Sequence, residues 1–159
     1  LFAESGFDND APLTAGAGIA LAYDTSIVHG GTRSLHVTGT LSASGTVLAT
    51  TVNCAARGTA TKASFWLRGI RSSVKAMAAY GLVFRLGSAT TFYNAGSFLT
   101  TVLDASTAAS WTANGFYLAD WTKIILNLPA GIDPSNDVFE VLAQTGPAID
   151  IYIDDIVLE

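Results

Sequence analysis

Two adjacent carboxylates near the end of the chain, Asp154 and Asp155, are the strongest candidates for a functional site, because they lie within a largely apolar segment. They lie inside the segment 149–158 (IDIYIDDIVL), where isoleucine alternates with more polar residues. A carboxylate in a half-buried strand is costly unless a cation or hydrogen-bond donors compensate its charge. We therefore expect a compensating group beside this pair. Neighbouring strand residues point to opposite faces, so the two are not expected to form the carboxylate pair of a glycosidase.

Other catalytic arrangements are not evident, and we do not expect an enzyme. The chain contains no G-x-S-x-G motif and no glycine-rich phosphate loop. His29 and His36 lie in and just after a turn, without a third ligand at metal-binding spacing. The sole cysteine, Cys54, excludes an intrachain disulfide and is expected to be a small buried residue.

Aromatic residues are the other chemical resource, because sugar rings stack on exposed aromatic faces while nearby polar groups fix their orientation. Trp111 lies in the loop-like segment 110–115 (SWTANG) and is the best exposed candidate; capping of that loop is the alternative. Trp66 and Trp121 are expected to serve packing. The residues expected to bind a ligand are Trp111, Tyr93, Asn94 and Tyr80.

The sequence pattern predicts that short strands position these residues. Segments rich in β-branched and aromatic residues are separated by Gly, Pro and Asn turn signals, and no capped helical period occurs. Residues 69–79 are the least strand-like part. The expected strands are residues 17–24, 33–38, 46–53, 61–68, 79–86, 97–103, 115–119, 121–128, 137–144 and 149–158. This spacing predicts an all-β, two-sheet β-sandwich of the jelly-roll type, with residues 1–159 as a single domain.

Composition narrows the function classes. Half of the 159 residues are hydrophobic and 13% are charged, which excludes disorder, while no run of 18 apolar residues predicts a membrane span. A net charge of −5 argues against nucleic acid as a partner. Residues 33–85 carry only basic charges, whereas 1–32 and 104–159 are acidic apart from Lys123. Either these segments neighbour one another in the fold, or they support head-to-tail self-association.

Five short segments, in order along the chain, share a pattern with a known family. The segments are residues 4–8 (ESGFD), 29–37 (HGGTRSLHV), 63–68 (ASFWLR), 121–124 (WTKI) and 151–156 (IYIDDI). Together they resemble the jelly-roll carbohydrate-binding modules of the family 4, 16 and 22 type, which are appended to bacterial polysaccharide-degrading enzymes. The resemblance covers both ends of the chain and is weakest over residues 69–115.

The resemblance implies a structural calcium ion away from the sugar site. Carried over by position, its ligands would be the Asp8 carboxylate, a carboxylate of Asp154 or Asp155, and a backbone carbonyl near Thr32. Calcium takes six to eight oxygen ligands of this kind. Asp8 replaces the usual Glu, and Thr32 a common Lys. The alternative is that the paired acids lie at a sheet edge and contact water or Arg33.

The resemblance also implies a function. It points to a non-catalytic module that binds polysaccharide or surface glycan, on an extracellular surface or as an appendage of a larger protein. The thin set of exposed aromatic residues and the low charge favour an alternative. In this alternative, the chain is a structural or decorating subunit of a viral or extracellular assembly that uses the same fold. Its partners would then be further copies of itself or other subunits of the assembly.

Overall fold

The computed structural model describes residues 7–8, 12–43, 45–51, 62–72, 83–88, 91–94, 111–112, 115–127, 138–143 and 148–158. All regular structure within these ranges is β-strand, as the turn-separated pattern predicts. None of these residues forms a helix that is long and apolar enough to cross a membrane.

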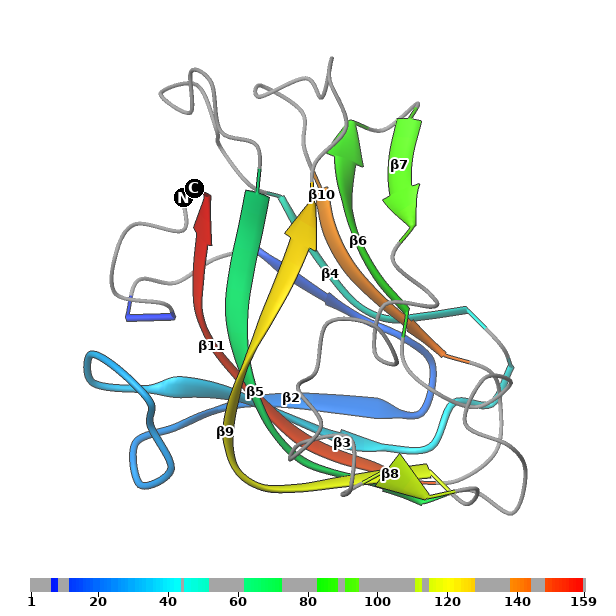
Figure 1. The fold of residues 1–159 in the computed structure, drawn as a ribbon. Helices are drawn as coiled ribbons and strands as arrows, with labels where there is room; N and C mark the ends of the chain where they lie inside the picture. Colours follow the sequence, from blue (N-terminus) through cyan, green and yellow to red (C-terminus); the bar gives the residue numbers. More distant parts are fainter. Residues whose placement is uncertain are drawn as a thin grey trace.

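The strands form two antiparallel sheets in the part of the chain that the structure describes (Figure 1). Sheet A has the order β1 (Leu13–Ala15), β4 (Gly45–Thr51), β10 (Val138–Ala143), β6 (Val83–Ser88) and β7 (Thr91–Asn94). Sheet B has the order β2 (Ile19–Asp24), β3 (Ser34–Gly39), β11 (Ile149–Leu158), β5 (Lys62–Ser72), β9 (Gly115–Asn127) and β8 (Trp111–Thr112). Most neighbours in a sheet come from distant parts of the chain, which is the connectivity of a jelly roll.

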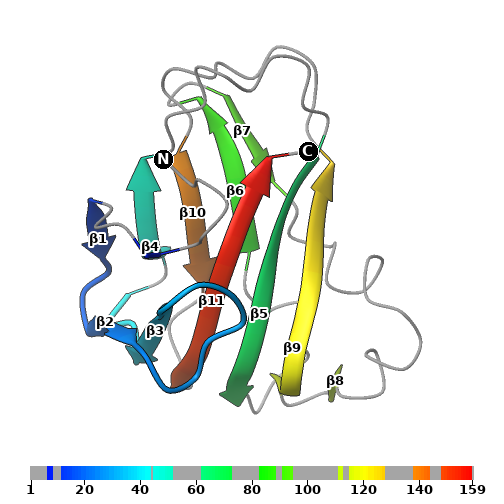
Figure 2. The same cartoon turned by 90° about the vertical axis from the view of Figure 1, so that its left-hand side faces the viewer.

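The two sheets pack face to face and enclose one core (Figures 1 and 2). Phe65 on β5 and Phe139 on β10 are fully buried, and their rings meet edge to face with centroids 5.3 Å apart. This contact joins sheet B to sheet A within the core. The β-sandwich prediction is therefore correct.

Alternation along β11 determines which side chains enter the core. Ile149, Ile151 and Ile153 are buried, whereas Asp150 and Tyr152 lie on the outer face of sheet B. The apolar side of β11 therefore faces the core that it shares with residues of sheet A, because successive side chains of a strand alternate between its two faces. The alternative that the paired acids lie at a sheet edge is wrong, since β11 lies between β3 and β5.

Several strand boundaries differ from prediction. β5 continues through residues 69–72, in the part expected to be least strand-like, because it pairs there with both β11 and β9. The two strands expected over 115–128 are one strand, β9, which changes register where it passes Leu67 and Gly69. The short strands β1, β7 and β8 were not predicted. The strand expected at 97–103 and Cys54 lie outside the described residues.

The pairing also explains the segregated charges. β5 comes from the basic part of the sequence and pairs with β11 from the acidic part, so that Arg68 lies opposite Tyr152, two residues from Asp150. The Arg33 guanidinium contacts the backbone oxygen of Asp8. Acidic and basic segments thus neighbour one another within a single chain, which is the first of the two explanations above.

Candidate functional site

The β2–β3 loop, residues 25–33, is the element around which the candidate metal ligands gather. In Figure 2 it passes in front of β11. The loop starts with a turn in which Asp24 Oδ1 accepts hydrogen bonds from the N–H groups of Ser26 (2.6 Å) and Ile27 (2.8 Å). These donors lower the pKa of Asp24. At the far side of the turn, the Ser34 hydroxyl donates to the Ile27 carbonyl.

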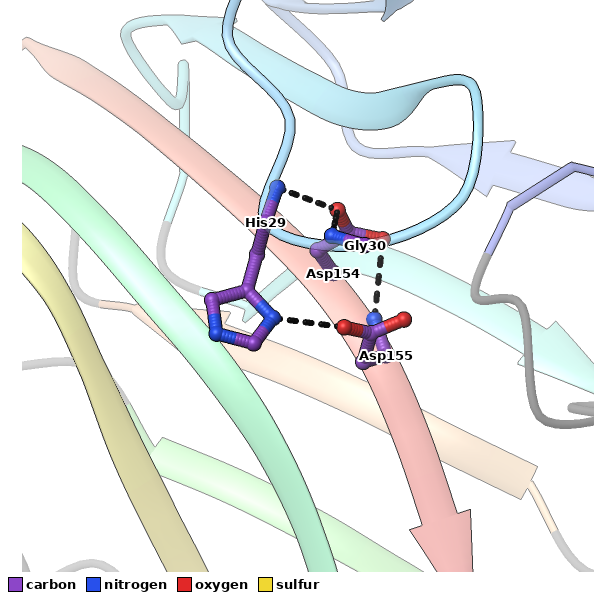
Figure 3. A network of polar contacts seen from close by, with 4 residues as sticks. All are labelled: His29, Gly30, Asp154 and Asp155. Atoms are coloured by element: carbon purple, nitrogen blue, oxygen red, sulfur yellow. Dashed lines mark hydrogen bonds and ion pairs between the residues drawn. The ribbon is translucent and has the colours of Figure 1, made fainter.

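Asp154 holds the middle of this loop (Figure 3). Its Oδ2 accepts from the N–H groups of His29 (2.8 Å) and Gly30 (3.2 Å), and its Oδ1 accepts from the N–H of Asp155 (2.9 Å). The residue is fully buried, and burial raises its pKa, although the three N–H donors act in the opposite direction. The compensating group expected beside the acidic pair therefore includes backbone N–H donors.

Asp155 turns toward the same loop, contrary to the expectation that neighbouring acids point apart. Its φ of 48° and a register irregularity between Asp154 and Val157 interrupt the strand alternation. As a result, Asp155 Oδ2 lies 2.6 Å from Nδ1 of His29 (Figure 3). The carboxylates of Asp154 and Asp155 thus both contact the β2–β3 loop.

Asp8 approaches the loop from the N-terminal side. Its Oδ1 accepts from the Thr32 N–H (2.7 Å), the Thr32 hydroxyl (2.8 Å) and the Arg33 N–H (3.1 Å). These bonds, led by the Thr32 N–H, lower the pKa of Asp8. Arg33 donates to the carbonyls of Phe7 and Asp8 and not to the paired acids.

Two glycines allow Asp8 and Asp155 to approach the loop. A Cβ on Gly30 would overlap the Asp155 carboxylate, and a Cβ on Gly31, where φ is 66°, would overlap Asp8 Oδ2. Because consecutive Cα atoms are about 3.8 Å apart, the two carboxylates rest against neighbouring residues. The N-terminal segment and the last strand are therefore brought together at the Gly30–Gly31 turn.

These residues can be tested against the chemistry of calcium. No group of three or more His, Cys, Asp or Glu side chains in the described ranges could hold a metal. Both oxygens of Asp154 already accept N–H groups, and Thr32 contacts Asp8 as a donor. The carboxylates of Asp8 and Asp155 fit the hard-oxygen preference of calcium, and backbone carbonyls or water would have to complete its shell.

His29 also organises two tryptophans on the outer face of sheet B. Its ring stacks on Trp66 at 3.9 Å and meets Trp121 edge-on at 5.8 Å, measured between ring centroids. Both tryptophans are half-buried. The packing role expected for them therefore takes place outside the core, against the loop, because Trp66 lies directly opposite the outward-facing Asp154.

The structure places the predicted ligand residues on different elements. Tyr93 and Asn94 belong to β7 of sheet A, whereas Trp111 belongs to β8 of sheet B. These two strands lie toward opposite ends of the sandwich in both views (Figures 1 and 2). The structure describes only the backbone of these three residues, and Tyr80 lies outside the described residues. A common site for the four remains a prediction.

A second set of outward side chains was missed at the sequence level. The rings of His36 and Tyr152 stack with centroids 4.1 Å apart, and His36 Nε2 lies 2.7 Å from Asp150 Oδ1. Beside Tyr152 is a surface hollow whose lining includes Arg68 and Ile27. The alternation of 149–158 already placed Asp150 and Tyr152 on one face; the missing information was the identity of the neighbouring strands.

Comparison with known proteins gives matches among solved structures. No protein-family model and no curated protein sequence matches the chain. The CBM22-1 xylan-binding domain from Paenibacillus barcinonensis Xyn10C aligns with a TM-score of 0.55 and 12% identity, over 98% of this chain and 90% of that one. The C-terminal family 22 carbohydrate-binding module of Clostridium thermocellum Xyn10B gives 0.50 and 12%, over 96% and 87%.

A third match comes from a study of carbohydrate-binding modules of the β-sandwich superfamily. It has a TM-score of 0.53 and 17% identity, and it covers 96% of this chain. This chain spans 60% of the length of that one. The fold is thus that of the β-sandwich carbohydrate-binding modules, as the resemblance predicted. Among these matches, the xylan-binding domain of family 22 is similar in fold along nearly the whole length of this chain.

Proposed function

We propose that this chain is a non-catalytic module that binds glycan, on an extracellular surface or as an appendage of a larger protein. The observation that carries the proposal is the match to a xylan-binding domain over 98% of this chain and 90% of that domain. Fold alone does not specify a ligand. The proposal therefore also depends on surface groups of this chain that could hold a sugar.

The polar chemistry supports a binding role over a catalytic one. A glycosidase needs two carboxylates placed on either side of the scissile bond. Asp154 and Asp155 instead hold the β2–β3 loop through His29 and Gly30. Acids used in this way contribute to structure and not to proton transfer.

Affinity electrophoresis tests glycan binding. The wild-type chain is run in native gels with and without arabinoxylan, hydroxyethylcellulose or galactomannan, and retardation is measured relative to the gel without polysaccharide. We expect retardation by at least one neutral polysaccharide. For the proposed ligand residues Trp111, Tyr93, Asn94 and Tyr80, Trp111→Ala is the first variant to compare. Absence of retardation in every gel and on a glycan array would remove the function.

We further propose that calcium binds between Asp8 and Asp155 as a structural ion. The convergence of these two carboxylates on the Gly30–Gly31 turn supports the site. A backbone carbonyl near Thr32 remains the proposed third ligand. Among the paired acids, the hydrogen bonds to Asp154 favour Asp155 as the ligand.

The alternative function is a structural or decorating subunit of a viral or extracellular assembly. The charged fraction of 13%, about half of the usual share, favours it, because such a surface suits contact with other subunits. Sedimentation distinguishes the two functions. Ordered oligomers with more than about 1,000 Å² buried per contact would support the assembly subunit. A monomer retained by glycan would support the module.

A further inference from the structure

The outer face of sheet B carries a row of side chains across four neighbouring strands. Ala22 on β2, His36 on β3, Tyr152 on β11 and Arg68 on β5 lie directly opposite one another in turn. Side chains that pair in this way share one face of a sheet. Tyr152 is thus flanked by His36 on one side and by Arg68 on the other.

The two sides of the Tyr152 ring have different surroundings. One side is covered by the His36 ring, which stacks on it with an interplanar angle of 5°. The surface hollow is lined by Tyr152 and Arg68 but not by His36, so it lies on the β5 side of the ring. The ring face toward β5 is therefore available to a ligand, while His36 holds the ring in place.

Polar groups of opposite charge border the hollow. Arg68 lines the hollow, and among the residues that the structure describes none forms a hydrogen bond or ion pair with its guanidinium donors. Asp150 is 58% exposed, and Oδ1 contacts His36, which fixes the orientation of the carboxylate. Asp150 and Asp24 both act to raise the pKa of Tyr152, after burial, which places two acids and one arginine around this phenol.

Apolar groups also line the hollow. Gly69 contributes no side chain there; its φ is 122°, and a Cβ would overlap the backbone of Asp150. Leu118 and Ile27 complete the apolar lining. The volume is about 180 Å³. Since pockets for drug-sized ligands measure roughly 300–1,000 Å³, this hollow suits a single ring.

We propose that this hollow binds one sugar ring of a neutral polysaccharide, an inference that rests on the proposed glycan-binding function. The ring stacks on the face of Tyr152 that points toward β5. Arg68 donates hydrogen bonds to the sugar hydroxyls, and Asp150 accepts hydrogen bonds from them. A uronic acid is disfavoured because Asp24 and Asp150 offset the single arginine. His36 is a positioning residue, and the site lies apart from Tyr93 and Asn94 on sheet A.

The test uses Arg68→Gln and Tyr152→Ala, with Lys62→Gln as the matched control. Lys62 is exposed on the same strand, and its substitution changes the net charge by the same amount. Each protein is run in gels with arabinoxylan, hydroxyethylcellulose or polygalacturonate, against a gel without polysaccharide. We expect wild type and Lys62→Gln to bind a neutral polysaccharide equally, and both site variants to bind about tenfold more weakly or worse.

The outcomes separate this site from the broader function. If wild type binds a neutral polysaccharide and Arg68→Gln, with an unchanged melting temperature, binds equally well, the site is wrong while glycan binding stands. Arg68→Gln alone tests the site even if Tyr152→Ala does not fold. Stronger binding to polygalacturonate than to neutral polysaccharides would overturn the proposed ligand class. No binding by wild type in any gel contradicts the proposed function itself.

Discussion

Asp154 and Asp8 both accept backbone N–H groups, yet their pKa values move in opposite directions. Asp154 is fully buried, and burial raises its pKa above 3.8. Ionisation of Asp154 at neutral pH therefore costs folding free energy, and its three N–H donors offset only part of this cost. Asp8 keeps contact with solvent, so the Thr32 donors dominate and lower its pKa. The surroundings, and not the residue type, decide the sign.

Removal of the Asp154 carboxylate should destabilise the fold. Asp154→Ala would leave the N–H groups of His29, Gly30 and Asp155 without their acceptor. Each buried donor without a partner costs about 1–3 kcal/mol. Because these three bonds are only part-buried, we expect the lower end of their sum, a loss of about 3 kcal/mol in unfolding free energy. In thermal unfolding this corresponds to a decrease of about 6–12 °C. Asp150→Ala, at an exposed acid of the same strand, is the control; equal effects would contradict the role of Asp154.

Asp24 provides a prediction about pH. Its pKa is lowered from 3.8 by the N–H groups of Ile27 and Ser26. A lowered pKa in the folded state stabilises the fold above the unfolded pKa, and this contribution is lost as pH falls through the folded pKa. Asp24→Asn keeps an oxygen acceptor but cannot titrate. We expect acid unfolding curves of this variant to depend less steeply on pH below about 4, and identical slopes would contradict the assignment.

Strand elements followed from the sequence where side chains alternate over six or more residues. The pattern of 149–158 predicted β11 and the orientation of Ile149, Ile151 and Ile153. β1, β7 and β8 have two to four residues, too few to show a period. The direction of Asp155 could not be predicted either. It depends on a bulge, which exists only once β11 is paired with β5.

The register shift in β5 provides a prediction at Gly69. This residue has a φ of 122°, and a Cβ there would overlap the backbone at Asp150 and Ile151 of β11. Unfavourable φ alone costs about 1–3 kcal/mol. We expect Gly69→Ala to lower the unfolding free energy by about 2 kcal/mol or more, measured by chemical denaturation.

Gly45→Ala is the matched control for the substitution at Gly69. Gly45 also has a positive φ, 156°, but nothing lies within 4 Å of the position of its Cβ. The difference between the two variants therefore reports the overlap between β5 and β11. A smaller loss at Gly69 than at Gly45 would contradict the close approach of these strands.

For the whole molecule, the resemblance predicted which segments converge around the proposed calcium ligands, but it did not predict the hollow beside Tyr152. It placed Asp8, the β2–β3 loop and the last strand together, and the structure brings them together at the Gly30–Gly31 turn. Their positions follow motifs at both ends of the chain. The hollow beside Tyr152 has no such motif. It arises from β5, β9, β11 and the β2–β3 loop, which are distant in sequence, so the residues that form it become neighbours only in the folded protein.

A calcium ion at this turn would link the N-terminal segment to β11 and so stabilise the whole fold. Binding at a concentration 100-fold above Kd stabilises by about 2.7 kcal/mol, which corresponds to about 5–11 °C in melting temperature for a chain of this size. We expect calcium to raise the melting temperature of wild type over that in chelator. Asp8→Asn and Asp155→Asn should lose most of this difference, because each removes a carboxylate ligand. Asp24→Asn, at the other end of the same loop, should retain it. Identical melts with calcium and with chelator, and no metal by elemental analysis, would exclude the ion.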